Sequence, residues 1–134
     1  MGPGVTPYLC DTHTLLWWAQ ETNRLGGAVR AILADPTTDI LVSPVTPWEL
    51  SMKYRIGKLA KAEPIVTAYA ETLRRLGAVS LPITDDHALL AGRLSWGYRD
   101  PFDRMLAAQA ILEGAVLLSA DVVFDTLPRL RRVW

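Results

Sequence analysis

Short apolar segments alternate with longer amphipathic ones along this sequence, and the alternation constrains the fold more than any other feature. The apolar segments are Tyr8–Cys10, Ile40–Val42, Val79–Ile83 and Ala115–Leu118, with Arg131–Trp134 as a candidate fifth strand at an edge. The stretches between them carry apolar side chains at helical spacing. Strands that alternate with helices indicate an α/β domain with a mainly parallel sheet of four to five strands flanked by helices.

Composition sets broad limits on the class of protein. Of the 134 residues, 50% are hydrophobic and 21% are charged, which excludes a disordered chain and suits one folded domain over residues 1–134. The 14 basic residues balance the 14 acidic ones, so net charge indicates no partner. The one cysteine, Cys10, cannot form an internal disulfide, which favours a reducing compartment.

The beginning of the chain carries no visible targeting signal. Residues 1–7 lack the basic and apolar parts of a secretory leader, and we expect them to be a disordered terminus or one added by cloning. No apolar run approaches the length that crosses a bilayer. We therefore expect a cytoplasmic protein that does not enter a membrane.

A helix start at Asp100 places a carboxylate in an awkward position. Asp100 has the short side chain of an N-cap, and Pro101 suits the first helical position. Asp103 then falls at the third position, above small apolar side chains on the same helix face. An unpaired charge drawn partly into the protein is costly, so other groups must compensate Asp103.

Three further acids follow the predicted strands. Asp11 ends the first apolar segment, Asp121 follows the fourth, and Glu49 opens the helix after the second. In parallel sheets the binding crevice lies beyond the carboxyl ends of the strands, so these side chains can converge with Asp103.

Four converging carboxylates would repel one another unless some protonate or a cation neutralises them. Oxygen ligands without a cluster of cysteine or histidine favour Mg²⁺ or Mn²⁺ over Zn²⁺. Such ions activate water and hold phosphate oxygens, so the residues indicate metal-assisted hydrolysis of phosphodiesters.

Each acid also has a purely structural interpretation. Glu49 fits a capping box with Thr46, Asp11 could begin a turn before a helix capped by Thr12, and Asp121 could cap a turn at Val122. We interpret Asp100 as a helix cap in preference to a metal ligand. Of the two histidines, we interpret His13 as local packing and His87 as part of a solvated helix. Four independent caps, however, need not share one edge of a sheet.

Basic and aromatic side chains supply candidate partner surfaces. Lys53, Arg55 and Lys58 follow Glu49, and Arg99 and Arg104 flank the acidic helix start. These five could hold an RNA backbone by neutralising phosphates, although a solvated helix explains the first three equally well.

Two adjacent tryptophans point to a further surface. Trp17 and Trp18 cannot both face the core squarely on one helix, so at least one is expected to be incompletely covered. An incompletely covered tryptophan favours a partner surface there.

Four segments carry a resemblance to a known family. They are Leu9-Cys10-Asp11-Thr12-His13, Pro47-Trp48-Glu49-Leu50, Arg99-Asp100-Pro101-Phe102-Asp103-Arg104-Met105-Leu106-Ala107-Ala108-Gln109-Ala110 and Ser119-Ala120-Asp121. They resemble the PIN-domain family, most closely VapC-type toxins of bacterial toxin–antitoxin pairs, in order from about Leu9 to Trp134. The Asp-Pro-Phe-Asp-Arg run is the most specific of the matching segments.

The resemblance implies a three-layer PIN-like fold and an Mg²⁺- or Mn²⁺-dependent endoribonuclease. It matches Asp11, Glu49, Asp103 and Asp121 to the family's catalytic, metal-binding acids. It also implies a homodimer and a VapB-like antitoxin that covers or enters the active site.

The same resemblance assigns supporting roles and shows two departures. Asp100 is an additional acid beside the quartet, and the hydroxyls of Thr12 and Ser119 support it. Ser119 stands where many relatives carry threonine, and Tyr98 where close ones often carry histidine. Neither departure removes an acid, although either could alter substrate preference.

Two other functions stay open at the level of sequence. One is a catalytically silent PIN-like module for RNA binding or assembly, which the complete acid set disfavours. The other is a hydrolase of small phosphate esters. The Asp11-Thr12-His13 segment lacks the second aspartate that an aspartyl-phosphate enzyme of the haloacid dehalogenase type would need.

Overall fold

Five parallel strands form the centre of the computed structural model, which describes residues 5–134. The sheet order is β3-β2-β1-β4-β5. The strands are β1 (Pro7–Cys10), β2 (Asp39–Val42), β3 (Val79–Ser80), β4 (Val116–Leu118) and β5 (Arg131–Val133). The predicted α/β fold with a parallel sheet is confirmed, and the candidate edge strand near the end of the sequence pairs in parallel with β4.

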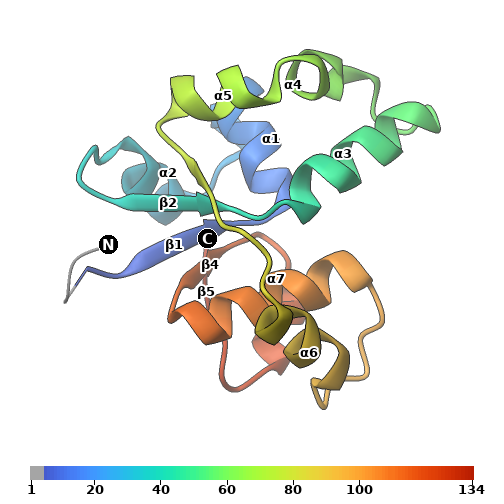
Figure 1. Cartoon of the computed structure of the whole chain (residues 1–134). Coiled ribbons are helices and arrows are strands. Elements are labelled where there is room, and N and C mark those ends of the chain that lie inside the picture. The colour runs from blue at the N-terminus through green and yellow to red at the C-terminus, as the bar shows by residue number, and fades with distance from the viewer. Residues whose placement is uncertain (1–4) are drawn as a thin grey trace.

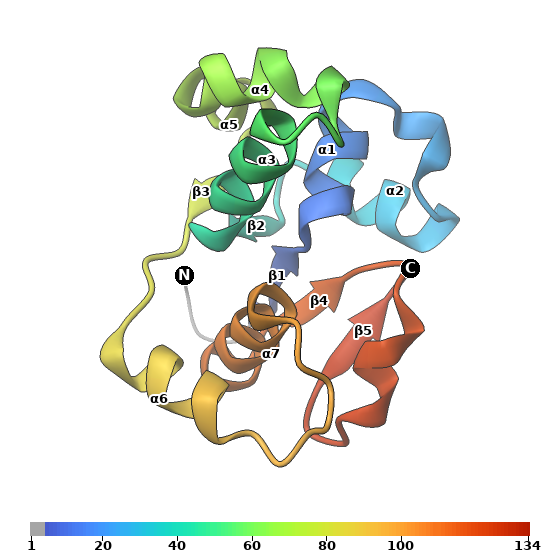
Figure 2. The ribbon, with the colours of Figure 1, turned by 90° about the vertical axis from the view of Figure 1, so that its right-hand side faces the viewer.

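Seven α-helices and three short 3₁₀ turns surround the sheet within residues 5–134. The helices are α1 (Thr12–Gln20), α2 (Gly27–Ala34), α3 (Val45–Arg55), α4 (Glu63–Thr67), α5 (Tyr69–Leu76), α6 (Asp85–Arg93) and α7 (Pro101–Glu113). The 3₁₀ turns are η1 (Thr22–Arg24), η2 (Ala60–Ala62) and η3 (Val122–Thr126). Helices α1 to α5 lie on one side of the sheet and α6 and α7 on the other, which gives three layers (Figures 1 and 2). None of the helices in the described range is both long and apolar enough to cross a membrane.

Two apolar cores follow from the alternation of side chains along each strand. Cys10 of β1 and Val42 of β2 face one core with α1, α2 and α3, whereas Leu9 and Leu41 face the other core with α7 and η3. Because both faces of the sheet are covered at its centre, β1, β2 and β4 are mainly apolar, which is why they could be located from sequence.

The site is set by the place where strand order reverses. From β1 the chain adds β2 and β3 on one side and then returns to add β4 and β5 on the other. Cys10 is paired with both Val42 and Leu118, and the backbone N–H of Asp11 donates to the Leu118 carbonyl at 3.1 Å. The residues that leave β1 and β4 therefore emerge side by side at the topological switch point.

Several predicted boundaries are wrong. Residues 1–4 of the expected disordered terminus lie outside the described residues, but Pro7 already belongs to β1, paired with Asp39. The strand expected at 79–83 ends at Ser80. The amphipathic stretch before β3 does not form one continuous helix: it is broken into α4 and α5 at Ala68, whose backbone leaves the helical region.

The predicted helix caps are also partly wrong. Asp11, not Thr12, is the N-cap of α1, and α3 begins after Pro44 with no side-chain cap. Thr46 and Glu49 therefore do not form a capping box. His87, expected to be solvated, is 1% exposed and completes a capping box with Thr84 at the start of α6.

Candidate active site

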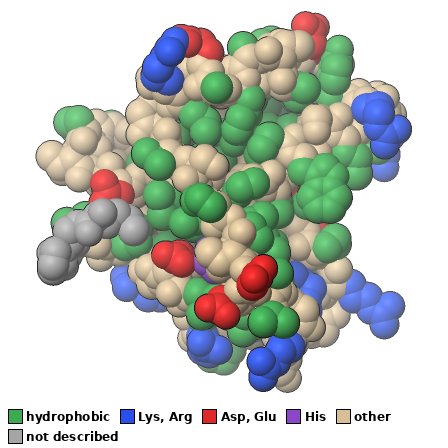
Figure 3. All heavy atoms as spheres, in the orientation of Figure 1, with side chains coloured by type: hydrophobic (Ala, Val, Ile, Leu, Met, Phe, Trp, Pro, Cys, Tyr) green, Lys and Arg blue, Asp and Glu red, His purple; other side chains and the backbone are tan. Residues whose placement is uncertain are grey.

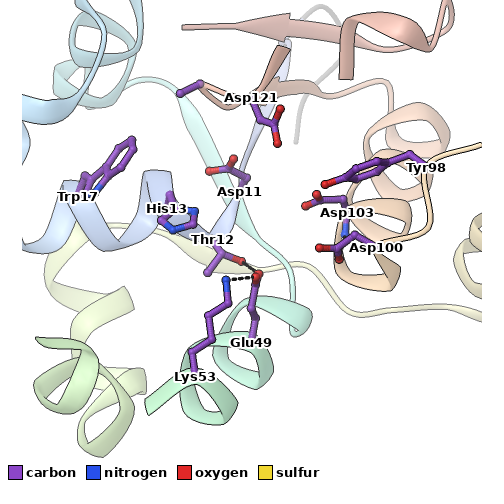
Figure 4. A pocket seen from close by; sticks show the side chains of 11 residues that line it. Asp11, Thr12, His13, Trp17, Glu49, Lys53, Tyr98, Asp100, Asp103 and Asp121 are labelled. Carbon is purple, nitrogen blue, oxygen red and sulfur yellow. Dashed lines mark hydrogen bonds and ion pairs between the residues drawn. The ribbon is translucent and has the colours of Figure 1, made fainter. Parts of the chain in front are cut away.

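A cavity of about 380 Å³ opens at the switch point, beyond the carboxyl ends of β1 and β4. It is lined by Asp11, Thr12, His13, Trp17, Glu49, Lys53, Tyr98, Asp100, Asp103, Ala120 and Asp121. All four acids predicted to converge are among them, and Figure 4 shows them approaching one another from separate elements.

Three of the acids in the cavity also begin helical segments. Asp11 accepts a hydrogen bond from the Thr14 backbone N–H at 2.8 Å, and Asp121 accepts one from Val123 at 3.0 Å. Asp100 accepts from the N–H groups of Phe102 and Asp103, at 2.9 and 3.2 Å. Capping and convergence are therefore compatible, because the caps aim these helix starts at the same cavity.

Glu49 reaches the cavity from the second turn of α3. Its side chain is almost wholly buried and accepts a 2.6 Å hydrogen bond from the Thr12 hydroxyl. Its other oxygen lies 2.8 Å from Lys53 Nζ. The side chain thus serves contacts between α3 and α1 instead of the helix end that a capping box would require.

Burial and mutual repulsion disfavour the charged form of the carboxylates in this site. Burial, reinforced by the nearby Asp100 and opposed by a hydrogen bond from Tyr98, raises the pKa of Asp103 to about 7. Burial also raises the pKa of Asp11, although the hydroxyls of Ser119 and Thr14 oppose the shift.

Tyr98 responds to the same excess of negative charge. Its pKa is raised to about 12, first by desolvation and then by Asp103. The tyrosine therefore stays protonated and can donate to the Asp103 carboxylate. The site as a whole favours binding of a cation.

The donor set fits a hard divalent cation in its chemistry, since every acidic ligand offers oxygen and the charge is incompletely balanced. As the side chains of residues 5–134 stand, no group of three or more His, Cys, Asp or Glu side chains could hold an ion. Glu49 is turned toward Lys53, and Asp11 and Asp121 are engaged as caps. Ion binding would therefore require these side chains to close inward.

The expected supporting residues differ in position. Thr12 lines the cavity, whereas Ser119 lies fully buried behind it and accepts a 3.0 Å hydrogen bond from the backbone N–H of Asp121. The Ser119 hydroxyl also holds down the pKa of Asp11, so one hydroxyl serves two acids that follow adjacent strands.

The expected RNA-binding residues are not all available for that role. Lys53 lines the cavity, and Arg55, Lys58 and Arg99 are exposed outside it. The structure corrects the expected role of Arg104. Its guanidinium donates to the carbonyls of Ala91, Leu94, Trp96 and Tyr98, at 2.7–2.9 Å. It holds the segment between α6 and α7 instead of facing solvent. On the face shown in Figure 3, Lys and Arg side chains lie at separate places around the edge and not in one basic patch.

Four residues of the cavity were not among the predicted site residues, namely His13, Trp17, Tyr98 and Ala120. His13 and Trp17 are four residues apart on α1, so their side chains lie on the same face of that helix. This face lines the cavity. The sequence marks Tyr98 only as a departure from the family pattern. No sequence feature indicates that its hydroxyl lies beside Asp103. Both Trp17 and Trp18 are partly buried, so neither is fully exposed.

Parallel strands in this order, with acids at the point where the order reverses, define one class of α/β protein. Comparison with known families identifies this class: the sequence model of the PIN domain family matches residues 8–130. The chain therefore belongs to the PIN domain family, as the sequence resemblance indicated.

Within the family, the relatives found are VapC proteins of Mycobacterium tuberculosis. Ribonuclease VapC22 is 28% identical over 121 residues, 87% of this chain and 88% of the relative. Ribonuclease VapC16 is 38% identical over 68 residues, and that match spans about half of each protein, 51% of this chain and 47% of the relative. A crystal structure of VapBC2 from Rickettsia felis, bound to a DNA fragment from their promoter, shares the fold with a TM-score of 0.71. It is 19% identical, and the match covers 96% of this chain and 98% of the other.

Proposed function

We propose that this protein is a divalent-metal-dependent endoribonuclease and the toxin of a toxin–antitoxin pair. The observation that carries the proposal is the convergence of Asp11, Glu49, Asp103 and Asp121 on one cavity. The names of the VapC relatives support ribonuclease activity in particular.

The chain's own residues hold and orient the reacting groups. Asp11, Glu49, Asp103 and Asp121 are the groups that would hold Mg²⁺ or Mn²⁺, with Asp100 beside them and Thr12 and Ser119 positioning two of the acids. A bound divalent cation supplies charge neutralisation at phosphate oxygens and a more acidic water. Lys53 supplies a fixed positive charge at the cavity wall, where it can attract a phosphate.

The surroundings of the cavity suit a nucleic-acid backbone. We propose that Lys53, Arg55, Lys58 and Arg99 contact phosphates of the RNA, and we leave out Arg104 because its donors are occupied. Contacts of this kind make binding strongly dependent on salt, so each loss should reduce the salt dependence of RNA affinity.

We also propose a small VapB-like antitoxin as the inhibitor, and a homodimer as the working form in the cytoplasm. The shared fold with a chain of the VapBC2 structure supports a VapB-like partner. Co-expression with a candidate antitoxin from a neighbouring reading frame, followed by co-purification and light scattering, tests partner and stoichiometry together.

The decisive experiment replaces the acids by their amides. Asp11→Asn and Asp103→Asn should each lower Mg²⁺-dependent cleavage of RNA by at least about a hundredfold, because each removes charge at the reacting centre. Circular dichroism should show an unchanged fold. Asp86→Asn, an exposed carboxylate on α6, is the matched control and should cleave as the wild type does. Cleavage that survives both active-site changes would overturn the proposal, and would favour a silent RNA-binding module if the wild type bound no metal.

A further inference from the structure

Two aromatic rings form one wall of the cavity that holds the acids. His13 and Trp17 both line it from α1, with ring centroids 5.6 Å apart and planes inclined by 41°. Figure 4 shows the two rings side by side, across the cavity from Tyr98 and Asp103. The proposed phosphodiester chemistry assigns no role to either ring.

The Trp17 ring is held in place from more than one direction. The guanidinium carbon of Arg24 lies 4.5 Å from the centre of the Trp17 ring, and Trp134 packs edge-on at 5.7 Å. Trp134 can approach this closely because Gly26 has no side chain: a Cβ there would lie 2.5 Å from the backbone of Trp134. A ring fixed in this way loses little conformational freedom when a ligand binds.

The two rings follow the acid Asp11 along α1 and line the same cavity as the reacting centre. Helix α1 begins at its cap Asp11, and Trp17 follows six residues later, roughly 9 Å along the helix axis. His13 lies between them and is exposed. A phosphate held among the acids would therefore place a neighbouring base against His13 and Trp17.

We propose that His13 and Trp17 form a nucleobase-stacking subsite for a nucleotide next to the scissile phosphate. The inference rests on the proposed ribonuclease function and gives a role to two rings that this function leaves unassigned: contact with a base beside the scissile phosphate. Stacking on aromatic side chains requires a base freed from its helix and tolerates any base identity. A sugar–phosphate chain suits this cavity better than an apolar peptide, because most of its other lining groups are charged or carry hydroxyls.

Trp17 also has a structural role, since it packs partly against the core on the α1 side of the sheet. The variants must separate packing from stacking. Trp17→Leu removes the aromatic face, and Trp17→Phe retains one. Trp18→Leu, the next residue on the same helix and packed against the same core, is the matched control because it does not line the cavity. His13→Ala removes an exposed ring at little cost to folding.

The test measures binding of a fluorescein-labelled single-stranded RNA of about 12 nucleotides by anisotropy with Mg²⁺. The Asp103→Asn background is used so that the RNA stays intact. Trp17→Leu and His13→Ala should each weaken binding about tenfold, while Trp17→Phe and Trp18→Leu stay near the background value. The same RNA in a duplex should bind weakly to every variant, with no difference among them.

Abasic nucleotides locate the stacked base. One abasic position, moved along the RNA, should lower affinity about tenfold at one or two adjacent places, and this loss should vanish in the His13→Ala/Trp17→Leu double variant. Abasic losses that persist in the double variant would overturn the subsite. Should Trp17→Leu fail to fold, His13→Ala with the same abasic series decides the matter.

The outcomes distinguish this inference from the proposed function. A wild type that cleaves RNA, with ring variants indistinguishable from Trp18→Leu, refutes only the stacking subsite. A wild type that neither binds nor cleaves RNA refutes the proposed function. Ring variants that bind RNA normally but escape inhibition by an antitoxin would identify a protein-docking surface, and would overturn the proposal.

Discussion

Lys53 Nζ lies 2.8 Å from Glu49 Oε2, one helical turn away on α3, inside the candidate active site. The Glu49 side chain is 9% exposed, so its charge is almost removed from water. Lys53 therefore acts as the protein's own counterion for one of the four acids. Among residues 5–134, no lysine or arginine forms an ion pair with Asp11 or Asp103, which agrees with the raised pKa of each.

Lys53→Met should tighten the binding of Mn²⁺ or Mg²⁺, by roughly three- to tenfold, because it removes a positive charge that competes for Glu49. Calorimetric titration of the RNA-free protein measures this directly. Lys58→Met, which removes an exposed lysine outside the cavity, should leave the dissociation constant unchanged. Equal or weaker metal binding by Lys53→Met would mean that Glu49 is not a ligand.

Asp103→Asn should stabilise the metal-free protein at high pH. The pKa of Asp103 is about 7 in the folded protein against an ordinary 3.8, so the folded state binds a proton that the unfolded chain has released. From this group, stability is greatest below about pH 4 and is lost as pH rises toward about 7. Because Asp103 is partly open to solvent, the gain in the asparagine variant should be only about 1–2 kcal/mol near pH 8.

Urea unfolding in EDTA at several pH values checks this pH dependence. The difference between Asp103→Asn and wild type should shrink as pH falls and vanish below about pH 3, where the wild-type carboxyl is protonated in both states. Asp86→Asn, at an exposed position, should show no such trend. A variant that is never more stable than wild type would show that Asp103 ionises freely in the metal-free site.

Gly26→Ala should destabilise the protein by about 1–3 kcal/mol, because the added methyl collides with the backbone of Trp134. Gly27→Ala is a matched control: it meets open space at the first position of α2, where alanine is a better helix former. Denaturant midpoints of the two variants give the comparison. Similar values would mean that the Trp134 segment moves aside easily and does not hold Trp17.

The fold and the acids could be predicted from sequence for the same reason. Strands buried on both faces form uninterrupted apolar runs, and the residue after each run marks the carboxyl edge where side chains meet. Asp11 and Asp121 could therefore be placed at the same edge of the sheet with no knowledge of strand order. The order itself was not predicted, because short strands of similar composition do not reveal their neighbours.

Local capping rules failed where several residues competed. Asp11 and Thr12 are consecutive and both suit an N-cap, and the tertiary contact of Thr12 with Glu49 leaves Asp11 to cap α1. Glu49 stands at capping-box spacing from Thr46, but α3 begins at Val45, two residues earlier than a cap at Thr46 requires, which takes Glu49 out of the first turn. A shift of two residues changed the assigned partner entirely.

Buried polar side chains were mistaken for solvated ones because their partners are distant in sequence. His87 was placed on an exposed helix face, yet its Nε2 lies 2.9 Å from Glu113 of α7, 26 residues away. It thereby ties α6 to α7, and no periodicity of α6 alone could indicate this. Arg104, predicted to contact RNA phosphates, is bound instead to backbone carbonyls, and such partners leave no mark in the sequence.

Arg104→Lys should destabilise the protein by about 2–4 kcal/mol, because an ammonium cannot reproduce the planar donors that serve four carbonyls at once. Urea unfolding measures the loss, with Arg93→Lys on the exposed side of α6 as the control. Cleavage activity should fall as well, since the held segment carries Tyr98 and precedes Asp100. If Arg104 instead served RNA, the lysine variant would keep its stability and lose affinity in a salt-dependent way, which would contradict the structural role assigned to it.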